Sequence, residues 1–103
     1  MLRITVQQTE AATGITLEGR VAGPWAVELD RAWTEVAPSL SSKKLSLDLR
    51  NVTYADAEGK RVLRDIYVRT HAEVVANTPW TQYLAAEITR ERQDGTDSTG
   101  NLS

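Results

Sequence analysis

Residues 45–60, LSLDLRNVTYADAEGK, decide the fold that we expect for this chain. Leucines alternate with polar residues from Leu45 to Leu49, and this period of two is typical of a half-buried strand. Asp56 is a residue type that favours the first position before a helix. The segment therefore predicts a strand over Leu45–Leu49, a loop over Val52–Asp56, and a helix from about Ala57 to Thr70.

The same reasoning extends toward the N-terminus. Apolar and polar residues alternate over Leu2–Val6 and again over Ile15–Val21, with a turn-like segment, Thr9–Gly14, between them. These two segments predict a strand hairpin. Gly23-Pro24 then opens a helix, because proline is well placed in a first helical turn.

Residues on both sides of segment 45–60 have the spacing of helical faces. The helix after Pro24 places its apolar residues three and four positions apart, and it ends at Pro38 and the polar run Ser39–Lys44. A short strand over Glu73–Ala76 precedes a helix opened by Thr78-Pro79. The expected apolar faces are formed by Trp25, Leu29, Ala32, Trp33 and Val36 in the earlier helix, and by Trp80, Leu84 and Ile88, joined in part by Tyr83, in the later one. We expect Trp33 to be buried, and Trp25 and Trp80, which begin their helices, to be partly exposed.

The order of these elements is β-β-α-β-α-β-α. Strands joined through helices imply right-handed crossovers onto a parallel sheet, whereas the first hairpin is antiparallel. We therefore expect an α/β domain over residues 1–90, with a mixed, mostly parallel four-stranded sheet and helices mainly on one face. Residues 91–103 are almost entirely polar and predict a flexible tail.

Composition excludes several classes of function. A chain of 103 residues with a formal net charge of -2 has no basic field for nucleic acid. It has no apolar run that would insert into a membrane or act as a signal peptide, so we expect a cytoplasmic protein. With no cysteine and one histidine, His71, we expect no metal site and no cofactor.

Three segments resemble the STAS domain family, the fold of anti-sigma-factor antagonists. They are Leu17-Glu18-Gly19-Arg20-Val21, the segment from Leu47 to Asp56, and Gly59, and the resemblance extends from Leu2 to Ile88. The family usually carries Asp-Ser-Ser-Gly or Asp-Ser-Thr-Gly at this helix start, where a serine or threonine is phosphorylated as a switch. Here the quartet is Asp56-Ala57-Glu58-Gly59, which has no hydroxyl.

This quartet has three interpretations. Asp56 is explained as a helix cap, and Glu58 as a negative charge at the positive end of the helix dipole. Alternatively, Glu58 stands where the family's phosphorylated residue stands and imitates part of its charge as a phosphomimetic. The third interpretation, catalysis by paired carboxylates, is disfavoured because no nucleophile or base accompanies them.

The resemblance implies a non-catalytic protein-binding module that phosphorylation does not switch at Glu58. Its partner would be an anti-sigma kinase-like regulator, and the chain could also form a homodimer. Two alternative functions remain: an accessory subunit of a bacterial ABC-type lipid transport system bound to the transporter ATPase, or a small-molecule or nucleotide-binding STAS domain. The expected partner-binding residues are Gly23, Pro24, Trp25, Thr53, Tyr54, Asp56, Ala57, Glu58, Gly59 and Lys60.

Overall fold

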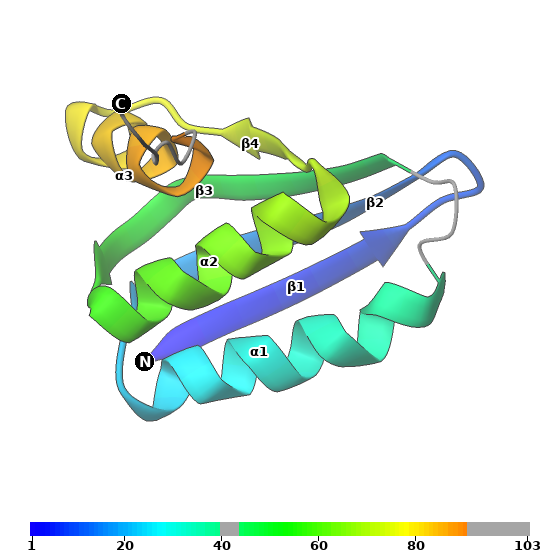
Figure 1. The fold of residues 1–103 in the computed structure, drawn as a ribbon, viewed down its shortest axis with the longest axis horizontal. Helices are drawn as coiled ribbons and strands as arrows, with labels where there is room; N and C mark the ends of the chain where they lie inside the picture. The colour runs from blue at the N-terminus through cyan, green and yellow to red at the C-terminus, as the bar shows by residue number, and fades with distance from the viewer. Residues whose placement is uncertain (40–43, 91–103) are drawn as a thin grey trace, which may run out of the picture.

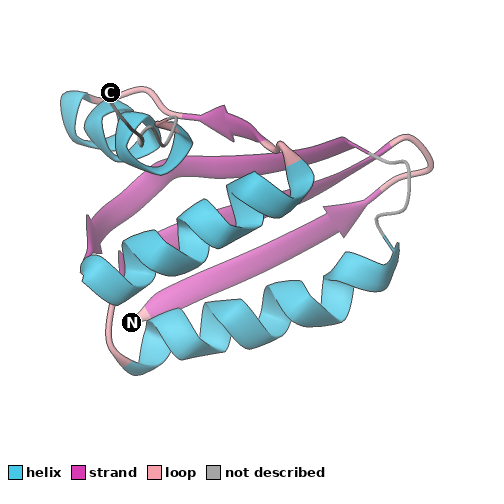
Figure 2. Cartoon of the chain, in the orientation of Figure 1, coloured by secondary structure: helices cyan, strands magenta, loops and turns pink. Residues whose placement is uncertain are grey.

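The computed structural model describes residues 1–39 and 44–90. Its elements follow the predicted order, as Figures 1 and 2 show. They are β1 (Leu2–Gln8), β2 (Ala12–Val21), α1 (Pro24–Val36), the short 3-10 helix η1 (Ala37–Ser39), β3 (Lys44–Ala55), α2 (Ala57–Thr70), β4 (Glu73–Val75) and α3 (Pro79–Thr89). The predicted tail over residues 91–103 lies outside the described residues.

One sheet holds the four strands in the order β1-β2-β3-β4. β1 and β2 form the predicted antiparallel hairpin, in which Leu2 lies opposite Gly19. β2 pairs with β3 in parallel, and β3 pairs with β4 in parallel. The mixed, mostly parallel sheet that the sequence predicts is therefore confirmed.

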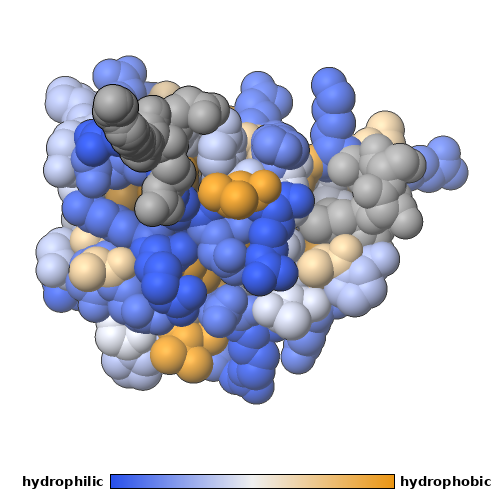
Figure 3. All heavy atoms as spheres, in the orientation of Figure 1, coloured by the Kyte–Doolittle hydropathy of each residue, from blue (hydrophilic) through white to orange (hydrophobic). Residues whose placement is uncertain are grey.

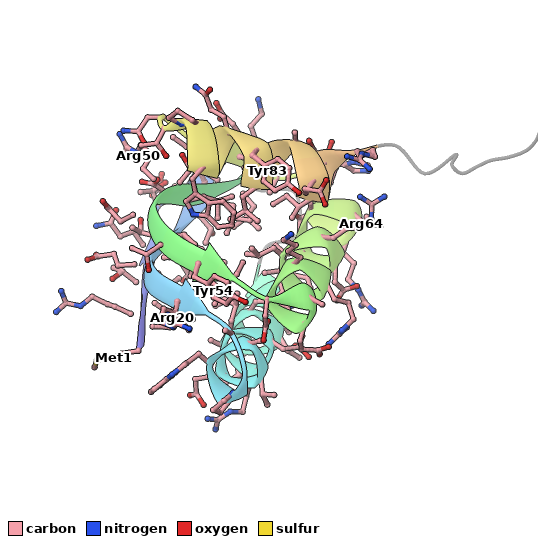
Figure 4. The ribbon with its side chains drawn as sticks, turned by 90° about the vertical axis from the view of Figure 1, so that its left-hand side faces the viewer. Met1, Arg20, Arg50, Tyr54, Arg64 and Tyr83 are labelled. Atoms are coloured by element: carbon pink, nitrogen blue, oxygen red, sulfur yellow. The ribbon has the colours of Figure 1, made fainter. Side chains whose placement is uncertain are left out.

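The three helices lie on the same side of the sheet (Figure 4). α2 packs against both α1 and α3, and the buried side chains between sheet and helices form one apolar core. Leu17, Leu47 and Leu63 are fully buried in it, and Trp33, which is 5% exposed, joins them as predicted. Tyr83 differs from the prediction, because its side chain is 52% exposed.

Strand β3 is longer than the sequence predicts, because it continues to Ala55. The prediction of a loop over Val52–Asp56 is therefore wrong. The ladder between β2 and β3 shifts register twice, between Thr16 and Glu18 and again between Gly19 and Arg20. At each shift β3 contributes an additional residue, as in a β-bulge. Leu49, Val52 and Ala55 are consequently buried at intervals of three, so the period of two is lost while the strand continues.

The turn expected over Thr9–Gly14 is also shorter in the structure. The backbone N–H of Thr9 donates to the Ala12 carbonyl at 2.8 Å, and the Thr9 hydroxyl bonds the same carbonyl at 3.0 Å. This closes the turn within four residues, and Ala12, Thr13 and Gly14 already belong to β2. Alanine and glycine have low strand propensity, which explains why the pattern alone placed the strand later.

The start of α3 is fixed to β3. Thr78 caps the helix as predicted, its hydroxyl accepting from the Thr81 backbone N–H. The Trp80 indole N–H donates to the Val52 carbonyl at 2.9 Å. Val52 lies in the irregular part of the β2–β3 ladder, so the indole bonds β3 at the point where its pairing is disturbed.

Gly59 marks the closest approach between a helix and the sheet. A Cβ atom added to Gly59 would lie 1.9 Å from the Val21 carbonyl oxygen, whereas one added to Gly14 would meet nothing within 4 Å. We expect Gly59→Ala to lower the free energy of unfolding by at least about 2 kcal/mol, because the first turn of α2 must move away from β2. Chemical denaturation measures the change.

The matched control is Gly14→Ala, which we expect to change stability by less than about 1 kcal/mol. Equal losses from the two variants would contradict the packing described for Gly59.

Candidate functional site

The expected partner-binding residues come together at one end of the sheet. β2 and β3 end side by side, with Val21 opposite Ala55, and each strand leads directly into a helix. The turn before α1 and the first turn of α2 therefore lie next to each other. We call this surface the rim; its residues are Gly23, Pro24, Trp25, Thr53, Tyr54, Asp56, Ala57, Glu58, Gly59 and Lys60.

The Asp56 carboxylate joins the two halves of the rim. Its Oδ1 atom accepts a hydrogen bond from the Gly59 backbone N–H at 2.7 Å, which is the expected helix cap. Its Oδ2 atom accepts from the Gly23 backbone N–H at 3.0 Å, in the turn before α1. These two bonds lower the pKa of Asp56 below its ordinary value of 3.8, with the Gly59 bond the larger cause.

Backbone contacts strengthen the same junction. The Asp56 N–H donates to the Val21 carbonyl at 3.2 Å, and the same carbonyl faces the Cα of Gly59. Gly59 is buried at this contact. The residue thus serves the packing of α2 on β2, and its backbone is not open to a partner.

Glu58 is exposed on the first turn of α2, and its charge has a partner within the helix. The Arg61 guanidinium bonds Glu58 Oε2 through Nη2 at 2.5 Å and through Nε at 3.0 Å. The hydrogen bond from Arg61 lowers the pKa of Glu58 from its ordinary value of 4.5. Glu58 is therefore ionised, and an adjacent guanidinium offsets part of its charge.

Tyr54 is a surface residue on the sheet face that carries no helix. It lies opposite Arg20 in the β2–β3 ladder, and the Arg20 guanidinium sits 4.8 Å from the centre of the Tyr54 ring. Figure 4 shows the two side chains together at the ends of their strands. Tyr54 is 42% exposed, so the contact leaves much of the ring accessible.

The remaining rim residues differ in their exposure to solvent. Trp25 begins α1 and is 38% exposed, and Thr53, Gly23, Pro24 and Ala57 are exposed. Lys60 is half-buried, and its ammonium group lies 5.4 Å from the centre of the Tyr83 ring of α3. The rim thus combines two accessible aromatic side chains with polar groups whose positions are fixed.

Sequence reasoning missed three neighbours of the rim, Arg20, Arg61 and Tyr83. The i, i+3 spacing of Glu58 and Arg61 on one helix was a signal that could have found the ion pair. Arg20 faces Tyr54 only because β3 continues through its irregular segment, and Tyr83 reaches Lys60 only through the packing of α3 on α2. No pattern in the sequence reports these two tertiary contacts.

Across residues 1–39 and 44–90, no three His, Cys, Asp or Glu side chains are grouped as a metal site would need. Nor is any helix of that part long and apolar enough to cross a membrane. In the view of Figure 3 the surface is mainly hydrophilic, and its hydrophobic areas are small and separate.

The Asp56 bonds predict a pH dependence of stability. Because the folded state lowers the pKa of Asp56, the stabilisation that Asp56 provides is present at pH values above 3.8. It is lost as the pH falls through the lower pKa that Asp56 has in the folded state. We expect Asp56→Asn, whose amide N–H₂ cannot accept from Gly23, to lower stability at pH 7 and to flatten the acid limb. Urea denaturation at a series of pH values from 7 to 2 measures both.

Asp48 gives the comparison for this experiment. Its pKa is also lowered, chiefly by a hydrogen bond from Arg50, but it lies on the open sheet face away from the rim. Asp56→Asn should leave the part of the acid limb due to Asp48 in place. An unchanged pH profile in Asp56→Asn would contradict the role of the two backbone bonds.

The sequence matches no protein-family model and no curated protein. Among solved structures, the fold is similar to an anti-sigma factor antagonist from Mycobacterium paratuberculosis, with a TM-score of 0.66 and 18% identity over 99% of this chain and 88% of that chain. It is also similar to part of the protein solved as Mglu, with a TM-score of 0.58 and 19% identity. That match covers 73% of this chain but only 19% of the longer protein.

At these identities the likenesses concern the fold. The resemblance that segment 45–60 suggested is therefore confirmed at that level, and the chain has the STAS-like α/β fold of an anti-sigma factor antagonist.

Proposed function

We propose that this chain is a non-catalytic protein-binding module and that the rim is its binding site. The observation that carries the proposal is the Asp56 carboxylate, which bonds the turn before α1 and the first turn of α2 at the same time. A surface whose two halves are joined before binding loses little conformational freedom on binding. The similarity to an anti-sigma factor antagonist supports a protein as the partner.

The rim offers side chains of the kind that dominate binding energy. Trp25 and Tyr54 are both more than a third exposed, and tryptophan and tyrosine are enriched among the residues that contribute most to interfaces. The partner class that the fold suggests is an anti-sigma kinase-like regulator. Binding of this chain would then compete with another protein for that regulator, or release that protein from it.

In this proposal the rim has one binding state, and phosphorylation does not switch it. Position 58 has no hydroxyl to phosphorylate, and Glu58 carries one charge that Arg61 partly offsets. A phosphate would carry about -1.5 to -2 charges. Glu58 therefore sets a moderate local charge and does not reproduce the phosphorylated form of a switch.

The missing hydroxyl equally suits a constitutive subunit of a lipid transport complex. In that alternative the rim binds the transporter ATPase, and the same rim variants test this binding. The identity of the captured partner distinguishes the two.

Nucleotide binding is the less favoured alternative. A hollow of about 360 Å³ lies between α1 and α2 and is lined by Asp30, Trp33, Thr34, Ala37, Arg61, Asp65 and Arg69. Its two guanidiniums already pair with carboxylates, Arg61 with Glu58 and Arg69 with Asp65. Phosphate groups need an excess of donors, and this hollow does not offer one.

Affinity capture with the immobilised domain tests the proposal. We expect a partner captured from the native lysate and identified by mass spectrometry to lose at least about tenfold in affinity with Trp25→Ala or Tyr54→Ala, a change of about 1.4 kcal/mol. Val68→Ala is the control, because Val68 is 53% exposed on α2 outside the rim. Equal binding by all four proteins would exclude the rim as the site.

A separate experiment tests whether phosphorylation changes the binding of this chain. Binding of the natural chain should not depend on ATP and kinase in the lysate, whereas Glu58→Ser introduces a hydroxyl that a kinase can modify. Thr53 is the serine or threonine nearest in sequence to the helix start, and it is exposed. Phosphorylation of Thr53 that changed the affinity would contradict a fixed binding state.

A further inference from the structure

The outer edge of β1 from Leu2 to Val6 is a second surface, and no strand of the described residues pairs with it. Among residues 1–39 and 44–90, β1 lies at the edge of the sheet and pairs with β2 alone. The Arg20 N–H donates to the Met1 carbonyl at 3.0 Å, so the backbone groups of Met1 point toward β2. Because this direction alternates along an antiparallel pair, those of Leu2, Ile4 and Val6 point outward.

This edge has few of the features that normally prevent strand addition. The register between β1 and β2 runs without a shift from Leu2 to Gln8, so no bulge twists the edge away. β1 contains no proline and a single charged side chain, Arg3. Natural sheets usually protect their edges with bulges, prolines or several charges.

Apolar side chains lie along the same edge on the helical side. Ile4 packs partly against the core, and Val6 is 37% exposed. α1 runs alongside β1 (Figure 1). Its Asp30 and Thr34 line the hollow toward α2, so helical periodicity places the half-buried Ala32 and Val36 on its other flank.

We propose that the β1 edge binds an extended segment of a partner protein as a fifth, antiparallel strand. Its backbone bonds Leu2, Ile4 and Val6, its apolar residues lie opposite Ile4 and Val6, and a carboxylate lies opposite Arg3. Arg3 faces Glu18 across the β1–β2 ladder, and no ion pair of Arg3 occurs within residues 1–39 and 44–90. Its charge remains available to the added strand.

The charge of Arg3 favours a partner segment over a second copy of this chain. β1 contains no aspartate or glutamate, so a copy that paired through its own β1 would place no carboxylate opposite Arg3. A partner segment that carries a carboxylate supplies this charge.

A designed peptide tests the proposal on the full chain. The probe is acetyl-Thr-Val-Thr-Val-Glu-Val-amide, which in antiparallel register places valines opposite Leu2, Ile4 and Val6 and its glutamate opposite Arg3. We expect saturating peptide to slow amide hydrogen exchange at Ile4 and Val6 by about tenfold or more, because free edge amides exchange readily. Unchanged exchange at these two amides would overturn the proposal, whatever the behaviour of variants.

Val6→Pro and Val6→Thr form the matched pair of variants. Proline at Val6 removes an outward N–H and leaves the ladder to β2 intact, and threonine keeps both the N–H and the β-branched shape. We expect Val6→Pro to abolish peptide binding and Val6→Thr to retain it. Binding that survives Val6→Pro in a folded protein would overturn the predicted edge contact.

The charge and the occupant are tested in the same way. Arg3→Glu should weaken binding of the peptide that carries glutamate. A second peptide, in which lysine replaces the glutamate, should bind the Arg3→Glu variant well. If the lysine peptide does not recover binding, the predicted register is overturned. Sedimentation of the chain without peptide should show no dimer that Val6→Pro dissociates. Such a dimer would show that a second copy, and not a partner segment, occupies the edge.

Discussion

The carboxylate of Asp56 is the interaction on which this end of the molecule depends. The two parallel strands β2 and β3 carry the chain to the same edge, and each then turns into a helix. Without a link, the two turns would be separate exposed segments. One side chain that accepts from Gly23 and from Gly59 makes them a single unit, and the close packing of Gly59 on the Val21 carbonyl holds α2 at the distance which those bonds require.

This junction also explains why the strand, the cap and the glycine of segment 45–60 are in place although positions 57 and 58 carry no hydroxyl. The strand, the cap and the glycine each have a structural task here, and none of these tasks needs a phosphate. Ala57 and Glu58 occupy the exposed positions between the structural residues. Because both side chains are exposed, changes at these two positions alter the surface charge and not the packing of α2.

Much of the fold was predictable because local patterns agreed with the final packing. The alternation over Leu45–Leu49, the cap at Asp56 and the start signals at Pro24 and Thr78 each report a contact made within a few residues. The end of β3 was not predictable, because two register shifts against β2 move Val52 and Ala55 onto the buried face with a spacing of three. For the same reason, the position of Tyr54 beside Arg20 had no signature in the sequence.

The three tryptophans of this phenylalanine-free chain have an optical consequence. Trp33 is enclosed in the core, Trp25 is partly in water, and Trp80 is half-buried with its indole N–H bonded to the Val52 carbonyl. Their emission spectra therefore differ, and each reports on a different layer of the molecule. Trp80 in particular places a natural fluorophore where the irregular strand meets α3, so a displacement of β3 from α3 would become visible without any added label.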